Sequence, residues 1–277
     1  RGAPDGYGYR NKVELSFGGA QYVSAEAHAG GAAREGRFLG FHAPGRFDRV
    51  VDAPRCELVS EAANRVIHVV RALSLVPDSP PAYDPHTHTG FWRHLLIREA
   101  HSDELLVVLY TTSMVEHEPW VERIADALAP ITAGFQWRLN DSVADVARGE
   151  VRRAWGAEHI EETLGSVRFR LGPTSFFQTN TAATVALYDT VGLALGRGGR
   201  LVDLYCGIGA IGLYLADRFD TILGVEENAD AVADARQNAL RIGIAAEFVA
   251  GDAECGAVER EVGERAGSGG GVCPHAG

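Results

Sequence analysis

The stretch that decides the fold is VDLYCGIGAIGLYLADRFDTILGVEE, Val202 to Glu227. Within it, Gly207, Gly209 and Gly212 have the spacing G-x-G-x-x-G, after an apolar strand-like run and at the start of a helical pattern. Glycine suits such a loop because a side chain would keep the backbone from approaching a ligand. Glu226 follows Gly207 by 19 residues, at the end of the next apolar run, where a carboxylate can accept both ribose hydroxyls of an adenosine. The stretch therefore predicts a site for an adenosine-containing cofactor.

The loop chemistry leaves NAD, FAD and S-adenosyl-L-methionine open as that cofactor. A dinucleotide pyrophosphate is bound best by a bare helix N-terminus. The ammonium group of a methionine is bound instead by an acid and by backbone carbonyls, and Asp203 lies in the strand that precedes Tyr205 and Cys206. These residues favour S-adenosyl-L-methionine, and a nicotinamide-dependent oxidoreductase is the alternative.

The segments around this stretch alternate between strands and helices. Helices are expected over 181–195, 210–217 and 228–241, and strands over 200–204, 221–225 and 246–250. This spacing predicts a parallel, doubly wound sheet, so we expect residues 172–253 to form a Rossmann-like α/β domain. A sheet that stops after three strands leaves a central strand as an edge, so we expect the domain to be truncated, the alternative being that the tail is an unrelated read-through. Residues 254–277 are expected to form an irregular, glycine-rich tail.

The first part of the chain, residues 1–171, has mainly strand signals and predicts an α+β domain of mainly antiparallel sheet. Val13, Leu15 and Phe17 alternate with polar residues, as in a half-buried strand. Hairpins are expected over 38–51, with a turn at Pro44-Gly45, and over 91–111; helices over 58–73 and 119–129; and a loop over 76–89.

Composition limits the class of protein. The 277 residues are 46% hydrophobic, which is enough for one large core or two ordinary ones. The sequence has no apolar run of about 20 residues that would span a membrane, and its four cysteines are too scattered for a disulfide framework. The first residues lack the apolar core of a signal peptide, so secretion is not expected. We therefore expect a cytoplasmic or organellar stromal monomer without a membrane partner. The net charge of −11 counts against binding nucleic acid by bulk electrostatics, although it leaves room for a local basic groove.

Several stretches together closely resemble the RNA uridine-5-methyltransferase family, whose members make 5-methyluridine in ribosomal and transfer RNA. They are LVDLYCGIGAIGLYLA, GVEENADAVADARQNALRIGI, EFVAGDAE, GPTSFFQTNTAAT, YRNKVELSFG and LGFHAPGRFDRVVDAPRCELVS. The similarity spans about 7–254, and the YRNK and GRFD wording is closer to the branch that acts on large-subunit ribosomal RNA. The resemblance implies S-adenosyl-L-methionine as the cofactor and RNA as the partner.

Position by position, the resemblance implies further cofactor contacts. Gln178 would reach the methionine end, Tyr205 would pack beside the cofactor, and Glu226 would hold the ribose. Asp252, at the end of the third strand, would bond the adenine amino group. The asparagine that many relatives have after the second glycine is Ala210 here. The alternatives are that Gln178 is an ordinary polar residue at a helix entry and that Tyr205 is a core aromatic.

The family chemistry needs a cysteine thiolate that adds to carbon 6 of uracil and a glutamate base that removes the proton from carbon 5. The family has the cysteine in an SCNP-like motif, preceded by an aspartate in a DPPR-like motif, with the glutamate base further on. None of these motifs occurs in this sequence, and neither Cys255 nor Cys273 is in a suitable context. We therefore name no catalytic residue and expect the chain as given not to methylate. A non-catalytic RNA- or cofactor-binding protein is the alternative reading. Cys206 is expected to pack.

Cys56 occupies the position where many relatives have the last of four cysteine ligands of an iron–sulfur cluster. One thiolate cannot hold a cluster that needs four, so a free cysteine is expected. His86 and His88 lie beside Asp84 in the expected loop and raise the hypothesis of a metal site. Because that loop has no further ligand nearby, we expect solvated side chains and no metal.

RNA contact is expected at Arg10 and Lys12 and at the turn that carries Arg46 and Arg49. These basic side chains flank extended strands, from which they can reach phosphates. The alternative is that they are ordinary solvated charges.

Overall fold

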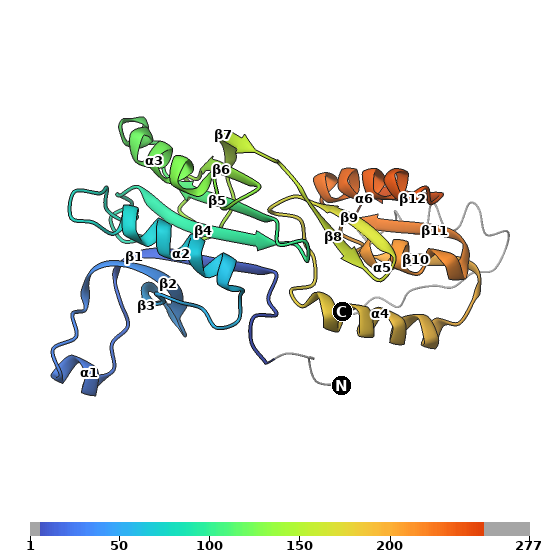
Figure 1. Ribbon diagram of the computed structural model, residues 1–277, viewed down its shortest axis with the longest axis horizontal. Coiled ribbons are helices and arrows are strands. Elements are labelled where there is room, and N and C mark those ends of the chain that lie inside the picture. Colours follow the sequence, from blue (N-terminus) through green and yellow to red (C-terminus); the bar gives the residue numbers. More distant parts are fainter. Residues whose placement is uncertain (1–5, 252–277) are drawn as a thin grey trace, which may run out of the picture. The chain divides into compact units, whose positions relative to one another are not determined.

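The computed structural model describes residues 6–251. The chain divides into two compact units (Figure 1). The first unit comprises Arg1–Thr163, Leu171–Pro173 and Thr179–Ala183, and the second comprises Leu164–Arg170, Thr174–Gln178 and Thr184–Gly277. No helix within the described residues is long and apolar enough to cross a membrane.

A seven-stranded sheet forms the first unit, in the order β3-β2-β1-β4-β5-β6-β7. Its strands are β1 (Lys12–Ala20), β2 (Glu35–Ala43), β3 (Arg46–Asp52), β4 (Trp92–Glu99), β5 (Leu105–Thr111), β6 (Gly134–Leu139) and β7 (Glu150–Gly156). All neighbouring strands are antiparallel except β5 and β6, which are parallel. The mainly antiparallel sheet that the sequence predicts is thus confirmed.

The alternation in β1 works as the sequence predicts. Val13, Leu15 and Phe17 are buried, whereas Glu14 between them is exposed. Both predicted hairpins also form, one from β2 and β3 and the other from β4 and β5.

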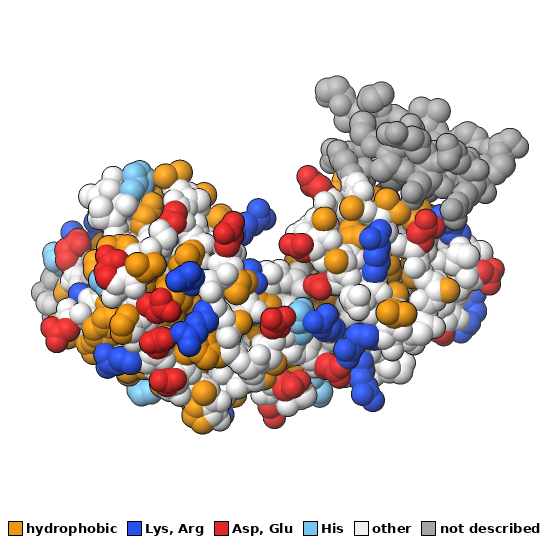
Figure 2. Space-filling model, turned by 90° about the horizontal axis from the view of Figure 1, so that it is seen from above, with side chains coloured by type: hydrophobic (Ala, Val, Ile, Leu, Met, Phe, Trp, Pro, Cys, Tyr) orange, Lys and Arg blue, Asp and Glu red, His pale blue; other side chains and the backbone are white. Residues whose placement is uncertain are grey.

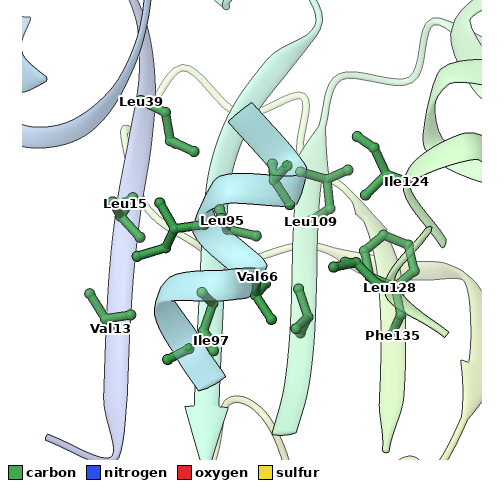
Figure 3. Packing of buried hydrophobic residues seen from close by; sticks show 14 of the residues in the cluster. Val13, Leu15, Leu39, Val66, Leu95, Ile97, Leu109, Ile124, Leu128 and Phe135 are labelled. Carbon is green, nitrogen blue, oxygen red and sulfur yellow. The ribbon is translucent and has the colours of Figure 1, made fainter. Parts of the chain in front are cut away.

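Two helices, α2 (Glu61–Ser74) and α3 (Glu118–Leu128), cover one face of this sheet (Figure 1). In Figure 3, Val66 of α2 lies over Leu95 and Leu109 of the central strands, and Leu128 of α3 lies near Phe135 of β6. Helix α2 begins three residues later than the sequence predicts. The reason is its N-cap, because the Ser60 hydroxyl accepts a hydrogen bond from the Ala63 N–H.

Strands β4 and β5 are buried on both faces. On the face opposite the helices, Leu96, Val108 and Tyr110 pack with Ala147. Arg93 ties the same covering segment to the sheet, because its guanidinium donates hydrogen bonds to the carbonyls of residues 140, 142 and 144. Both terminal nitrogens of this buried, charged side chain therefore have hydrogen-bond acceptors.

Some elements lie where the sequence analysis predicted none. They are α1 (Ala25–Ala29), the 3-10 helix η1 (Val115–His117), β6, β7, and the hairpin of β8 (Ile160–Leu164) and β9 (Val167–Leu171). Strand β7 is an edge strand whose side chains are nearly all exposed, so it has no apolar alternation to detect.

The second unit contains a parallel three-stranded sheet in the order β10-β11-β12. Its elements are β10 (Gly198–Leu204), α5 (Ala210–Tyr214), the 3-10 helix η2 (Ala216–Arg218), β11 (Phe219–Glu226), α6 (Ala229–Ile242) and β12 (Ala246–Ala250), preceded by α4 (Thr181–Leu195). The predicted order and the parallel direction are confirmed. Asn228 caps the start of α6, and Gly243 in a left-handed conformation ends it.

Candidate functional site

The glycine loop lies at the carboxyl end of β10, directly before α5. Tyr205, Gly207 and Gly209 have φ angles of +60°, +54° and +77°, so the backbone turns through three left-handed positions. The loop is also attached to the next strand, because the Cys206 N–H donates a 3.0 Å hydrogen bond to the Val225 carbonyl. The carboxyl ends of parallel strands are where ligands bind in folds of this type.

The glycines of the loop have different physical roles. A Cβ atom at Gly207 would meet no other atom within 4 Å, so the backbone there is open to a ligand. A Cβ at Gly209 would lie 2.7 Å from Cζ of Phe248, and one at Gly212 would lie 3.1 Å from Cγ2 of Ile222. Close packing of the loop on the sheet therefore explains Gly209 and Gly212, whereas the space beside Gly207 is open.

Glu226 is the last residue of β11, and its carboxylate is hydrogen-bonded to the glycine loop. Its Oε2 accepts a 3.0 Å hydrogen bond from the Gly207 N–H, and its Oε1 accepts a 2.9 Å hydrogen bond from the Asn228 N–H. The carboxylate is therefore held in place beside the open glycine. Two acceptor oxygens in a fixed position suit a vicinal diol such as a ribose.

Asp203 acts mainly on the loop itself. Its Oδ2 accepts a 3.2 Å hydrogen bond from the Gly212 N–H, which is in the first turn of α5. Burial raises the pKa of the Asp203 carboxyl, although the Gly212 N–H opposes this shift. The sequence analysis favoured Asp203 as a partner of the cofactor's ammonium group. In the structure its carboxylate accepts a hydrogen bond from α5 and so positions that helix.

Tyr205 is 61% exposed at the end of β10, so the alternative reading of this residue as a core aromatic is wrong. Gln178 is half-buried in the irregular segment before α4. The Ser175 hydroxyl anchors that segment by donating a 2.8 Å hydrogen bond to Asp234 of α6, and Phe177 packs against Phe169. The remaining predicted cofactor contact, Asp252, lies outside the described residues.

Two residues that the sequence analysis did not select complete this site. Phe248 of β12 packs its ring against the loop, and a Cβ at Gly224 would lie 2.4 Å from Cδ1 of that ring. Neither the loop nor β11 has a side chain where the ring lies, because Gly209 and Gly224 leave the space. The glycine inside the predicted strand TILGV was the available signal, since glycine in a strand often marks a close approach.

The described cysteines are both buried. Burial raises the pKa of the Cys206 thiol to about 12, and the charges of Asp203 and Glu226 add to the shift. A thiol in this state is protonated and inert at neutral pH, which agrees with the expected packing role. Cys56 is a free cysteine in the first core, and its backbone is bonded on both sides by the Asn64 amide. Cys255 and Cys273 lie outside the described residues.

The predicted RNA-contacting residues all lie on the first unit. Arg10 is exposed and donates a hydrogen bond to the Lys12 carbonyl, and burial together with Arg98 lowers the pKa of Lys12. Arg46 forms a two-bond fork with Asp48, whereas Arg49 makes only a looser, 3.7 Å contact with that acid. Figure 2 shows Lys and Arg side chains interspersed with Asp and Glu on the visible face. Local geometry, and not bulk charge, must therefore carry any contact with RNA.

The loop with the histidine pair has internal contacts. Asp84 accepts a hydrogen bond from the His86 N–H, and the His88 ring is 2.9 Å from the Tyr83 hydroxyl. The His86 ring lies against Phe47 of β3. In the described part of the chain, no group of three or more His, Cys, Asp or Glu residues could hold a metal ion.

Comparison with known proteins gives a family model and curated relatives named RNA methyltransferases. Residues 180–262 match the family described as "Methyltransferase small domain". The chain is 36% identical over 247 residues to an uncharacterized RNA methyltransferase of Chlorobaculum tepidum, covering 86% of this chain and 50% of that protein. It is 29% identical over 254 residues to the tRNA (uracil(54)-C(5))-methyltransferase of Pyrococcus furiosus, covering 91% and 56%.

A solved structure is similar as well. The tRNA (uracil-54, C5)-methyltransferase of Pyrococcus abyssi, in complex with S-adenosyl-L-homocysteine, superposes with a TM-score of 0.71 at 25% identity. The match covers 90% of this chain and 57% of that one. The chain spans about half the length of the curated relatives it matches. The chain is therefore similar to proteins named RNA methyltransferases, and its residues 180–262 match the model of the methyltransferase small domain.

Proposed function

We propose that this chain binds S-adenosyl-L-methionine at the glycine loop and RNA on the first unit, in the service of methylating carbon 5 of a uridine. The observation that carries the proposal is the open backbone at Gly207 beside the fixed carboxylate of Glu226. The similarity to the Pyrococcus enzymes named for uracil C5 methylation supports the choice of base.

The cofactor of this site is S-adenosyl-L-methionine, and the described residues fit it. Glu226, fixed by the Gly207 N–H, would receive the ribose hydroxyls, exposed Tyr205 would pack beside the cofactor, and Gly207 leaves room for its close approach. When bound, the cofactor supplies an electrophilic methyl group. Gln178, held on the segment anchored to α6, is our candidate for contact with the methionine end.

The nucleophile of the uracil reaction is not supplied by the described cysteines. Cys206 is buried with a raised pKa, and Cys56 is part of the core of the first unit. We therefore propose that this chain on its own binds cofactor and RNA without transferring the methyl group. This keeps the non-catalytic binding protein as a second candidate function for the chain as given.

The class of RNA needs a direct comparison. The YRNK and GRFD wording of the first unit favours ribosomal RNA, and this is our proposal. The named Pyrococcus relatives are instead tRNA enzymes. Transcripts of a large-subunit ribosomal RNA domain and of a tRNA, compared at one fixed salt concentration, decide between them. Tighter binding of the tRNA would contradict the proposal.

Cofactor binding is tested by calorimetry with S-adenosyl-L-homocysteine. We expect the change Glu226→Ala to weaken binding by about 10-fold to 100-fold, because it removes charge-assisted hydrogen bonds. Glu227→Ala is the matched control, since Glu227 is the adjacent, exposed acid. Stabilisation of the chain by NAD but not by S-adenosyl-L-homocysteine in a thermal shift assay would refute the cofactor assignment in favour of an oxidoreductase.

Methyl transfer is tested with radiolabelled S-adenosyl-L-methionine and the same two transcripts. We expect label to stay in the soluble cofactor when the chain acts alone. Label that appears in RNA would contradict the proposed lack of a nucleophile, and nucleoside analysis would then identify the modified atom.

A further inference from the structure

A cavity of about 320 Å³ lies on the first unit, away from the glycine loop in the sequence. Its walls come from the end of β1, from β2 and β3, from residues 82–86, and from Arg93 and Asp145. This volume is at the small end for ligand sites, so it suits one base-sized group and not an extended ligand. Nothing in the proposed cofactor site uses any of these residues.

One wall of the cavity is aromatic and exposed. Phe47 is 60% exposed, and its ring centroid is 5.4 Å from that of His86. Tyr83, which also lines the cavity, is held by Arg93, whose guanidinium carbon lies 4.0 Å from the ring centroid. Arg93 itself is only 2% exposed and bonded to three carbonyls, so the Tyr83 ring has a rigid support. Aromatic rings fixed at a surface cavity are the platforms on which unstacked bases bind.

Two of the carboxylates that line the cavity, those of Asp48 and Asp145, already have partners. Asp48 accepts two hydrogen bonds from Arg46, and Asp145 is 2.7 Å from the His42 ring and 3.2 Å from the His94 ring. These pairings reduce the repulsion that the acids would exert on a polyanion. The cavity is not a phosphate site, because four carboxylates line it, from Glu35, Asp48, Asp84 and Asp145, and only two arginines, Arg49 and Arg93.

One donor in the cavity remains available. Nε of Arg49 is buried and makes no hydrogen bond within the described residues, because its ion-pair partner, Oδ2 of Asp48, lies 3.7 Å away, too far for a hydrogen bond. A buried guanidinium N–H without an acceptor is unfavourable, and an acceptor on a ligand would satisfy it. The carbonyl oxygens and ring nitrogens of nucleobases are such acceptors.

We propose that this cavity binds one unstacked nucleobase of the RNA, stacked on Phe47 with its edge toward Arg49. The inference rests on the proposed RNA-binding function and gives it a second contact point, separate from the base that is modified. A base held here would fix the register of the RNA strand on the first unit.

The test measures base-dependent binding apart from phosphate-dependent binding. Two fluorescently labelled single strands of about 12 nucleotides, one of mixed-sequence RNA and one abasic sugar-phosphate chain of the same length, are titrated with the full chain by anisotropy at one salt concentration. The dissociation constant of the abasic strand divided by that of the RNA strand reports what the bases contribute. We expect Phe47→Ala to reduce this ratio by about 5-fold to 100-fold and Phe47→Trp to preserve it.

Tyr22→Ala is the matched control. Tyr22 is 55% exposed on the same unit, and it does not line the cavity. A ratio that stays at the wild-type value in Phe47→Ala overturns the inference, as does an equal fall in Phe47→Ala and Tyr22→Ala. Equal weakening of the base-containing and abasic strands also overturns it, since Phe47 would then act on the backbone or on folding. A wild-type chain that binds neither strand refutes the proposed RNA-binding function itself, which is a distinguishable result.

Discussion

The different roles of the loop glycines lead to a quantitative prediction for the change Gly209→Ala. The new Cβ would lie 2.7 Å from the Phe248 ring, in a backbone with φ of +77°. The left-handed conformation costs an alanine about 1–2 kcal/mol, and overpacking against a buried ring adds about 1–3 kcal/mol. We expect a loss of about 2–5 kcal/mol in the unfolding free energy of the second unit.

The change Gly207→Ala is the comparison. Its φ is +54°, but the new Cβ would meet nothing within 4 Å. Only the conformational cost of about 1–2 kcal/mol applies. We therefore expect Gly207→Ala to leave the fold nearly intact and to weaken S-adenosyl-L-homocysteine binding. We expect Gly209→Ala to act mainly by lowering the unfolding free energy of the second unit.

Hydrogen exchange of the β11 amides, followed by mass spectrometry, is the suitable assay. It reports opening of the second sheet directly. Tryptophan fluorescence cannot do so, because all the tryptophans lie in the first unit. They are Trp92, Trp120, Trp137 and Trp155.

A double-mutant cycle provides the decisive control. Phe248→Leu removes the ring atoms that the Gly209→Ala methyl would strike, so in this background we expect Gly209→Ala to cost only the conformational term of about 1–2 kcal/mol. Strictly additive effects of the two changes would refute the packing argument. Equal destabilisation by Gly207→Ala and Gly209→Ala would refute it as well.

Three further predictions concern charge and protonation. Asp48→Asn frees Arg46 from its two hydrogen bonds with Asp48 and should strengthen RNA binding, whereas Arg46→Ala should weaken binding and flatten its salt dependence. Anisotropy titrations at several salt concentrations check both. An unchanged slope of log affinity against log salt concentration in Arg46→Ala would remove Arg46 from the RNA contact. The hydrogen bond with Asp145 raises the pKa of His42. The pair's contribution of about 0.5 kcal/mol to the unfolding free energy should therefore be present below about pH 6.5 and lost as the pH rises through the raised pKa. In urea unfolding of the first unit, the difference in unfolding free energy between pH 6 and pH 9 should be smaller in His42→Gln than in the wild type. Cys206, with its pKa raised to about 12 by burial, should resist iodoacetamide at neutral pH in the folded chain, and Cys206→Ala should keep wild-type affinity for S-adenosyl-L-homocysteine; rapid labelling seen by mass spectrometry would contradict the inert assignment.

Local patterns predicted the cofactor domain closely. Helix α4 spans Thr181–Leu195 and strand β12 spans Ala246–Ala250, which are the predicted bounds. The spacing from Gly207 to Glu226 predicted a carboxylate beside the glycine loop, and the two are joined by a 3.0 Å hydrogen bond. These successes have one physical reason: side-chain periodicity and turn geometry are properties of neighbouring residues, and the topology of consecutive parallel strands adds little freedom.

The tertiary structure alone decided the features that join distant segments. Phe248 fills the space that Gly209 and Gly224 leave, and the cavity beside Phe47 takes a wall from Asp145, almost one hundred residues away in the sequence. Such contacts depend on strand order and on which faces meet, and a periodic pattern does not encode either of these. The sequence by itself therefore determined that a cofactor loop forms and where its carboxylate lies, whereas only the packed sheets decided which glycine faces a ligand and which faces a ring.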